Sequence, residues 1–250
     1  MRAMQLSVAA MLWVSAAVGE QVLEDVYLVR EARELRFGNS RLELRLDATD
    51  AAMVGLIAKT HGANVVAGGS RAPAFDVRLD GEWVVRRPEA LRVTSAAASR
   101  RSGRALLTVK AAGPGCEVEV VYSLAPMETR LEKSIRLTYV GGDAPKLSGL
   151  RFPLPPFAIG SRTTCSYTMP AYGAGPIGYT KLRTGRTFRS WFNQCGAWVV
   201  FHNGEQRLSV VASFYSGEED FAVVTTEGRA GVCCAHEVRI LDRASEGYRL

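Results

Sequence analysis

The acidic residues of the segment "YSGEED", Glu218, Glu219 and Asp220, have the type and spacing that could hydrolyse a glycosidic bond. Two carboxyl groups held at a fixed separation across a sugar can act as acid and base, or as acid and nucleophile. Three consecutive acids on one loop usually face water instead, and we favour that interpretation here. The sequence therefore assigns no catalytic residue to this loop.

The chain holds three histidines: His61 in the turn "THGAN", His202 beside "HNG", and His236 in a strand-like stretch. A histidine can act as a general base when it lies within hydrogen-bond reach of the group it deprotonates. No serine–histidine–aspartate spacing, "GxSxG" motif or phosphate-binding glycine loop is recognisable in the sequence. We expect these histidines to be surface or packed residues. An enzyme that uses His202 or His236 with an acid is the alternative.

The cysteines do not have the spacing of metal ligands. No two of them are separated by two residues, and His236 is the one histidine that lies near any of them. We therefore expect no metal site and no cofactor. Their odd number leaves at least one thiol unpaired in an oxidising compartment. The five residues are Cys116, Cys165, Cys195, Cys233 and Cys234.

The middle of the chain is basic and rich in aromatic residues. Residues 144–204 contain no Asp or Glu, so the net charge of +6 is concentrated there. Flat aromatic faces pack against the C–H edges of sugar rings, and arginine binds carboxylated or sulfated glycans through paired contacts. The expected ligand is a poly- or oligosaccharide, with anionic glycans included. The predicted carbohydrate-binding residues are Tyr172, Tyr179, Arg183, Arg186 and Trp191.

The same residues have a simpler interpretation, in which Trp191 and Trp198 are core anchors and the arginines form a solvated face. A basic and aromatic surface also suits nucleic acid, but the start of the chain argues against that partner. Residues 1–19 have the basic start, short apolar centre and small exit residues of a signal peptide. We expect cleavage before Glu20, a secreted or periplasmic protein, no nucleic acid partner and no membrane contact after cleavage. An uncleaved anchor is the alternative.

Side-chain alternation predicts the elements that must position these residues. Leu42, Leu44 and Leu46 alternate with charged residues, which is the period of a strand with one buried face. Asp80-Gly81 and Asn203-Gly204 each lie between two extended runs and suit tight hairpin turns. We expect all-β structure, a large antiparallel β-sandwich over residues 20–250.

Two further expectations concern the ends of this domain. Residues 25–37 are ambiguous, and we interpret them as a strand with a bend. The chain stops directly after a strand-like run, so residues 20–250 could be the N-terminal part of a longer protein.

The opening of this domain resembles a known family. "NSRLELRLDATDAAMVGLIAKTHGANVV" followed by "FDVRL" is similar to the start of galactose-mutarotase-like β-supersandwich domains, which stand at the N-terminus of many secreted glycoside hydrolases. Ala51-Ala52 stand where that family commonly has glycine. The residues that fit are Asn39, Leu42, Leu44, Leu46, Leu56 and Thr60-His61-Gly62.

This resemblance implies that catalysis belongs to a separate barrel domain, downstream of residue 250, against which the supersandwich packs. Mutarotases themselves use a His and a Glu, but neither motif can be placed on His202, His236 or Glu218, so no catalytic residue is carried over. We therefore expect a secreted, non-catalytic, carbohydrate-associated module with a glycan and a catalytic domain as partners. The alternatives are a self-sufficient mutarotase-like or polysaccharide lyase-like enzyme, and a structural exported domain that mediates subunit contacts.

Overall fold

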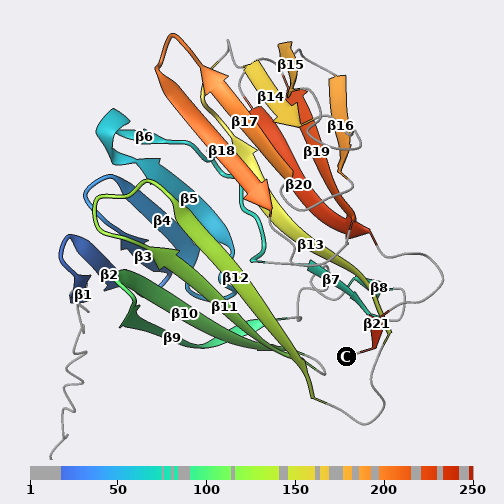
Figure 1. Cartoon of the computed structure of the whole chain (residues 1–250). Helices are drawn as coiled ribbons and strands as arrows, with labels where there is room; N and C mark the ends of the chain where they lie inside the picture. The colour runs from blue at the N-terminus through green and yellow to red at the C-terminus, as the bar shows by residue number, and fades with distance from the viewer. Residues whose placement is uncertain are drawn as a thin grey trace, which may run out of the picture.

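The computed structural model confirms the all-β fold class: the chain forms antiparallel strands joined by turns (Figure 1). One short 3-10 helix, η1 (Lys59–His61), lies in the part that the structure describes. No helix in that part is long and apolar enough to cross a membrane. The described residues are 18–74, 76–79, 82–83, 91–113, 116–140, 146–160, 164–168, 177–181, 186–192, 197–214, 221–229, 233–241 and 248–249.

Two sheets from the first half of the chain pack face to face and form the first sandwich. Sheet A runs in chain order through β1 (Val18–Leu23), β2 (Val26–Arg30), β3 (Glu34–Gly38), β4 (Leu42–Asp47), β5 (Met53–Ala58) and β6 (Ala63–Asn64). Sheet C has the order β12-β11-β10-β9, with β9 (Arg92–Arg101), β10 (Arg104–Gly113), β11 (Cys116–Leu124) and β12 (Leu131–Tyr139).

The core of this sandwich comes from the inward positions of both sheets. Leu44 and Leu46 of β4 are fully buried, as their alternation predicts, and they share one apolar cluster with Leu107 of β10 and Val120 of β11. Not every outward-facing position of β4 is exposed to solvent: Glu43 is also buried, with 7% of its surface exposed. Period-two patterning therefore identified the strand and its apolar face, but not the environment of the opposite face.

Two further antiparallel sheets come mainly from the second half of the chain, with β7 and β8 added from the first half. Sheet B has the order β16-β19-β20-β13-β7-β8, with β21 also paired to β13, and sheet D has the order β15-β14-β17-β18. The strands of sheet B are β7 (Asp76–Leu79), β8 (Glu82–Trp83), β13 (Lys146–Phe157), β16 (Arg186–Phe192), β19 (Phe221–Arg229), β20 (Cys233–Leu241) and β21 (Tyr248–Arg249). Those of sheet D are β14 (Thr164–Thr168), β15 (Ile177–Lys181), β17 (Ala197–Asn203) and β18 (Leu208–Phe214).

A short backbone seam joins the two halves. The amide of Ala67 donates to the carbonyl oxygen of Pro156, and the amide of Ala158 donates to that of Val65, both at 2.8 Å. Beside this seam the rings of Phe157 and Phe201 lie with centroids 6.0 Å apart. Paired hydrogen bonds next to buried rings hold the end of β13 firmly against the segment that follows β6.

Both predicted hairpins are present, but one has a different turn. Leu79 pairs with Glu82, so the connection between β7 and β8 has the predicted length of two residues; Asp80-Gly81 itself lies outside the described residues. Asn203 pairs with Leu208, so four residues separate β17 from β18 and the two-residue turn expected at Asn203-Gly204 is wrong. The reason is that the buried Asn203 side chain accepts hydrogen bonds from two amides of the loop, which holds the longer connection in place.

The segment 25–37 is not one bent strand. It contains β2 and β3, which pair antiparallel as a hairpin, and the amide of Glu31 donates to the carbonyl oxygen of Glu34 in the turn. The turn between β4 and β5 contains the departure from the family pattern: Ala51 has a φ of 59°. Glycine adopts that left-handed conformation without strain, whereas alanine adopts it only at a cost.

Candidate functional site

The residues predicted to bind carbohydrate are divided between two sheet edges. Tyr179 lies in β15, at the edge of sheet D, while Arg186 and Trp191 lie in β16, at the edge of sheet B. Tyr172 and Arg183 lie outside the described residues. β14, the neighbour of β15 in sheet D, contacts β16 of sheet B, and Figure 1 shows β14, β15 and β16 gathered at one end of the second half. The backbone thus brings the described members to one region.

The three histidines lie in three different elements, η1, β17 and β20. In the described contacts, His61 in η1 pairs with the hydroxyl of Thr60 and, through Nε2, with the carbonyl oxygen of Arg207 at 3.2 Å. His202 lies in sheet D with its Nδ1 2.9 Å from the Ser209 hydroxyl, whereas His236 lies in sheet B. The acidic segment 218–220 lies outside the described residues. His61 therefore helps to join the two halves, since it contacts the loop between β17 and β18.

No metal site is found among the described residues, since they contain no group of three or more His, Cys, Asp or Glu side chains placed to hold an ion. Cys116 is a buried free thiol in the first sandwich. Burial raises the pKa of this thiol, which disfavours the thiolate needed for nucleophilic chemistry. Cys116 is therefore a packing residue.

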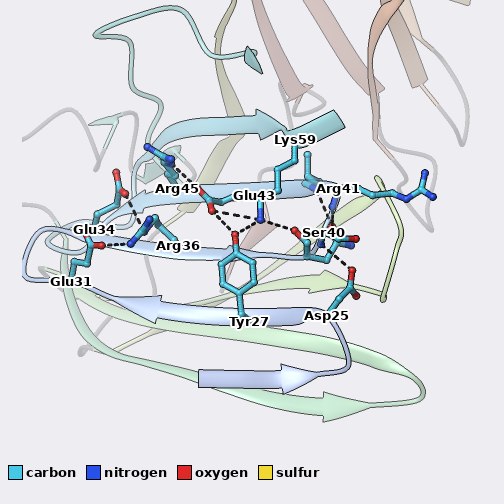
Figure 2. Close-up of polar contacts among 12 residues, drawn as sticks. Asp25, Tyr27, Glu31, Glu34, Arg36, Ser40, Arg41, Glu43, Arg45 and Lys59 are labelled. Atoms are coloured by element: carbon cyan, nitrogen blue, oxygen red, sulfur yellow. Dashed lines mark hydrogen bonds and ion pairs between the residues drawn. The ribbon is translucent and has the colours of Figure 1, made fainter. Parts of the chain in front are cut away.

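The described residues do contain one concentrated polar cluster, on the outer face of sheet A (Figure 2). We call Tyr27, Glu43, Arg45 and Lys59 the Tyr27–Glu43 cluster. Register places Tyr27 of β2 and Glu43 of β4 on either side of Gly38 in β3. A Cβ atom at Gly38 would lie 2.4 Å from the carbonyl oxygen of Leu42 and 2.8 Å from the Cα of Glu43, so no other residue fits there without movement of the backbone.

The carboxylate of Glu43 is the centre of this cluster. Its Oε2 accepts a hydrogen bond from the Tyr27 hydroxyl, and its Oε1 accepts one from Nε of Arg45 at 2.8 Å. The Lys59 ammonium lies 3.9 Å from Oε2, 2.5 Å from the Tyr27 hydroxyl and 4.4 Å from the centre of its ring. Figure 2 shows these side chains converging from β2, β4 and the start of η1.

Electrostatics keep this carboxylate ionised. Burial by itself opposes the charge on Glu43, but the hydrogen bonds from Tyr27 and Arg45 and the charges of Arg45 and Lys59 outweigh it and lower the pKa. Burial and the Glu43 carboxylate raise the pKa of Tyr27, whose hydroxyl therefore stays protonated. Burial lowers the pKa of Lys59, and the Glu43 charge partly offsets that effect.

This arrangement suits a structural role, in which the cluster holds the strands together, better than a catalytic one. A general acid needs a raised carboxyl pKa, and a general base needs an oxygen free to take a proton. Glu43 has a lowered pKa and hydrogen-bond donors on both oxygens. The cluster can fix β2, β4 and η1 to one another and present Arg45 and Lys59 at the surface. Charge and side-chain alternation did not predict this cluster; the isolated glycines within strands, Gly38 and Gly55, which face long side chains, are the signal that could have indicated it.

A second polar contact ties the two sheets of the first sandwich together at one end. Asn39, which is fully buried, donates from Nδ2 to the carbonyl oxygens of Ala125 and Glu128. Its Oδ1 accepts from the amides of Arg41 and Leu42. Asn39 was one of the residues that carried the family resemblance, and the structure gives it a positioning role between the β3–β4 and β11–β12 turns.

The chain matches no protein-family model, and it matches no curated protein in sequence. Its fold is similar to that of the GH36 α-galactosidase AgaB from Geobacillus stearothermophilus, with a TM-score of 0.58 and 12% identity over 89% of this chain and 39% of that one. GH36 α-galactosidase AgaA from the same organism gives a TM-score of 0.50 and 14% identity over 94% of this chain and 39% of that one. The chain spans about two fifths of the length of these structures. At these identities the likeness is one of fold.

Proposed function

We propose that this chain is an exported, carbohydrate-associated β-sandwich module that serves a separate catalytic domain of a glycoside-hydrolase-like protein. The observation that carries the proposal is the fold similarity to α-galactosidases, which extends over most of this chain but over 39% of the AgaB chain. The remaining length of such a protein is available for a catalytic domain. Fold similarity alone does not assign activity, so the chemistry of the described residues provides the second argument.

The chemistry of the described polar groups favours a structural role for this chain over a catalytic one. The Glu43 carboxylate is held by donors on both oxygens, and the Cys116 thiol is buried and protonated. Both groups stabilise the first sandwich and leave it without a free nucleophile or acid at these positions. A module of this kind contributes a rigid surface to its partner, as accessory sandwiches do when packed against another domain.

The proposed glycan contact lies in the region of β15 and β16, which β14 links because it pairs with β15 and contacts β16. Tyr179, Arg186 and Trp191 belong to this region, and Tyr172 and Arg183 precede and follow β15 in the sequence. An aromatic ring would pack on a pyranose face, while an arginine would bind a carboxylate or sulfate of the same glycan. Anionic polysaccharides are therefore the preferred ligand class.

Export follows from residues 1–19, which we propose are removed as a signal peptide before Glu20. β1 starts at Val18, so cleavage before Glu20 would remove the first two residues of this edge strand. The pairing of β1 with β2 would then begin at Glu20, which pairs with Leu28. Mass spectrometry of the N-terminus of secreted protein tests this step. Recovery of the intact N-terminus from a cytosolic fraction would contradict it.

Affinity electrophoresis of the purified chain through gels with neutral and anionic polysaccharides tests the functional proposal. We expect retardation by at least one polymer, stronger for uronic acid polymers, and no turnover in a polarimetric mutarotation assay or a release assay on the same polymers. Turnover would favour the self-sufficient enzyme. Self-association in sedimentation without glycan retardation would favour a structural domain that mediates subunit contacts.

A further inference from the structure

The two faces of sheet D differ in burial. Phe201 of β17 is fully buried, and its ring centre lies 6.0 Å from that of Phe157 in sheet B. His202, the next residue, and its cross-strand partner Ser209 are exposed. Val211 has 64% of its surface exposed, the largest fraction for a bulky apolar residue in the described part of the chain. Because successive residues of a strand lie on opposite faces, one face of sheet D packs toward sheet B and the other faces solvent at these positions.

Register aligns the outer positions of sheet D in rows that cross its four strands. The first row carries basic and hydroxyl residues: Lys181, Thr164, His202 and Ser209. The second row is mainly apolar: Tyr179, Ser166, Val200 and Val211. We call these the basic row and the apolar row. Trp198, two residues before Val200 on β17, occupies the same face beside the apolar row.

The dimensions of these rows follow from strand geometry. Neighbouring strands lie about 4.8 Å apart, so each row is about 14 Å long. The two rows are two residues apart along every strand, which is about 6.7 Å. Within the basic row, Nδ1 of His202 lies 2.9 Å from the Ser209 hydroxyl, and this hydrogen bond orients the imidazole along the row. The face is thus long enough for more than one sugar ring and has a basic half beside an apolar half.

The charge of sheet D distinguishes it from the outer faces of sheets A and C. The four strands of sheet D contain no Asp or Glu. The outer face of sheet C instead interleaves acids with bases. Oε2 of Glu119 lies 3.7 Å from Nζ of Lys110, and Oε1 of Glu132 lies 3.2 Å from Nε of Arg130. The outer face of sheet A holds the Glu43 carboxylate. A polymer with carboxylates therefore meets no like charge on the strands of sheet D and meets the basic row there.

A uronic acid unit has the same two-part chemistry. The C–H groups of its ring form a flat apolar surface, which packs against aromatic and aliphatic side chains. Its carboxylate projects from the edge of the ring, where it pairs with a cation or accepts hydrogen bonds from hydroxyl groups. A ring placed on the apolar row brings its carboxylate toward the basic row, and successive units of a polymer repeat this match along the rows.

We propose that the outer face of sheet D binds a uronic acid polymer whose chain runs across the strands, with its rings on the apolar row and its carboxylates along the basic row. This inference rests on the function proposed above and specifies its surface and ligand class. Trp191 and Arg186 belong to β16 of sheet B, so this surface is separate from their strand. A second copy of the chain is the competing occupant, because β18 is an edge strand of its sheet.

The sign of a charge introduced at Val211 tests the inference. Val211→Lys and Val211→Asp are compared by their dissociation constants for polygalacturonate, obtained by affinity electrophoresis at low salt with each mobility divided by that in a gel without polymer. We expect Val211→Lys to bind at least about tenfold more tightly than Val211→Asp, because the new charge lies beside the carboxylates. Val140→Lys and Val140→Asp are the matched controls, since Val140 is another exposed valine, at 54%. Their dissociation constants should differ by less than about twofold.

Equal binding by the two Val211 variants, with retardation of the wild type that Trp191→Ala weakens, would overturn this inference and leave the proposed function intact. A wild type that no polymer retards would overturn both. Self-association in sedimentation that the Val211 variants abolish, without a charge-dependent change in polymer binding, would assign the face to a second copy instead. Ser209→Lys and Ser209→Asp, at an exposed position of the same strand, give the same comparison if a Val211 variant does not fold.

Discussion

The side-chain amide of Asn39 donates to the backbone carbonyl oxygen of Glu128, 2.8 Å away and 89 residues later in the chain. This bond joins the turn between two strands of sheet A to the turn between two strands of sheet C. Together with the bond to the Ala125 carbonyl and the two amides that Oδ1 accepts, it uses the full hydrogen-bonding capacity of a buried amide. The end of the first sandwich therefore depends on an amide at this position.

Asn39→Asp replaces the donor of this contact with a second acceptor facing two carbonyl oxygens. We expect a loss of about 2–4 kcal/mol in the free energy of unfolding, measured by urea denaturation at pH 7. Asn64→Asp is the matched control, because Asn64 uses only its Oδ1, which accepts from the amides of Leu56 and Val66. It should change stability by less than about 0.5 kcal/mol. Equal losses in the two variants would contradict the role assigned to Asn39.

Gly160→Ala should be strongly destabilising. Gly160 has a φ of 99°, and a Cβ there would lie 2.3 Å from Nδ2 of Asn203, whose amide donates to the Ile159 carbonyl at 2.7 Å. We expect a loss of about 2–4 kcal/mol by urea denaturation, since both backbone conformation and space oppose a side chain. Gly68→Ala meets nothing within 4 Å and has no positive φ, so it should be neutral or slightly stabilising. A neutral Gly160→Ala would contradict the close approach of Asn203 to Gly160.

Glu43→Gln should weaken the protein at neutral pH and remove part of its acid sensitivity. The pKa of Glu43 is lowered from 4.5, so its contribution is present above that value and is lost as pH falls through the lower folded-state pKa. We expect a loss of about 1–3 kcal/mol at pH 7, and a flatter dependence of urea midpoint on pH between 5 and 3. Glu117→Gln, on an exposed position of β11, should retain the wild-type slope.

The strands that alternate most regularly could be predicted from the sequence. The leucines of β4 and the Asp80-Gly81 hairpin are examples, because both signals are local. The pairing of β13 with both β7 and β20 could not be predicted, since those partners are separated by dozens of residues and no local pattern encodes the order of strands. The four-residue loop after Asn203 was missed because a buried side chain, not the dipeptide itself, decides its geometry.

The buried charged groups could not be predicted for the same reason: their environments depend on contacts between residues distant in the sequence. Glu43 and Lys133 each break the alternation rule in opposite ways: one is an acid buried on the outer face, and the other is an amine on the inner face. Their environments come from Tyr27 and Arg45 in one case and from Ala74 in the other, across strands whose register the sequence does not reveal. The composition of residues 144–204 points to a segment that contains β14, β15 and β16, and its role in glycan binding stays a prediction.

The central proposal is glycan contact by a non-catalytic module in the region of β14, β15 and β16, where β14 contacts β16. The most direct measurement is the apparent dissociation constant for a uronic acid polymer, obtained by affinity electrophoresis of wild type, Trp191→Ala, Arg186→Ala and the matched control Arg136→Ala, which alters an exposed arginine of β12. We predict at least about tenfold weaker binding for Trp191→Ala, a smaller loss with reduced salt dependence for Arg186→Ala, and no change for Arg136→Ala. Retardation that is absent in the wild type, or equal in all four proteins, would contradict the claim.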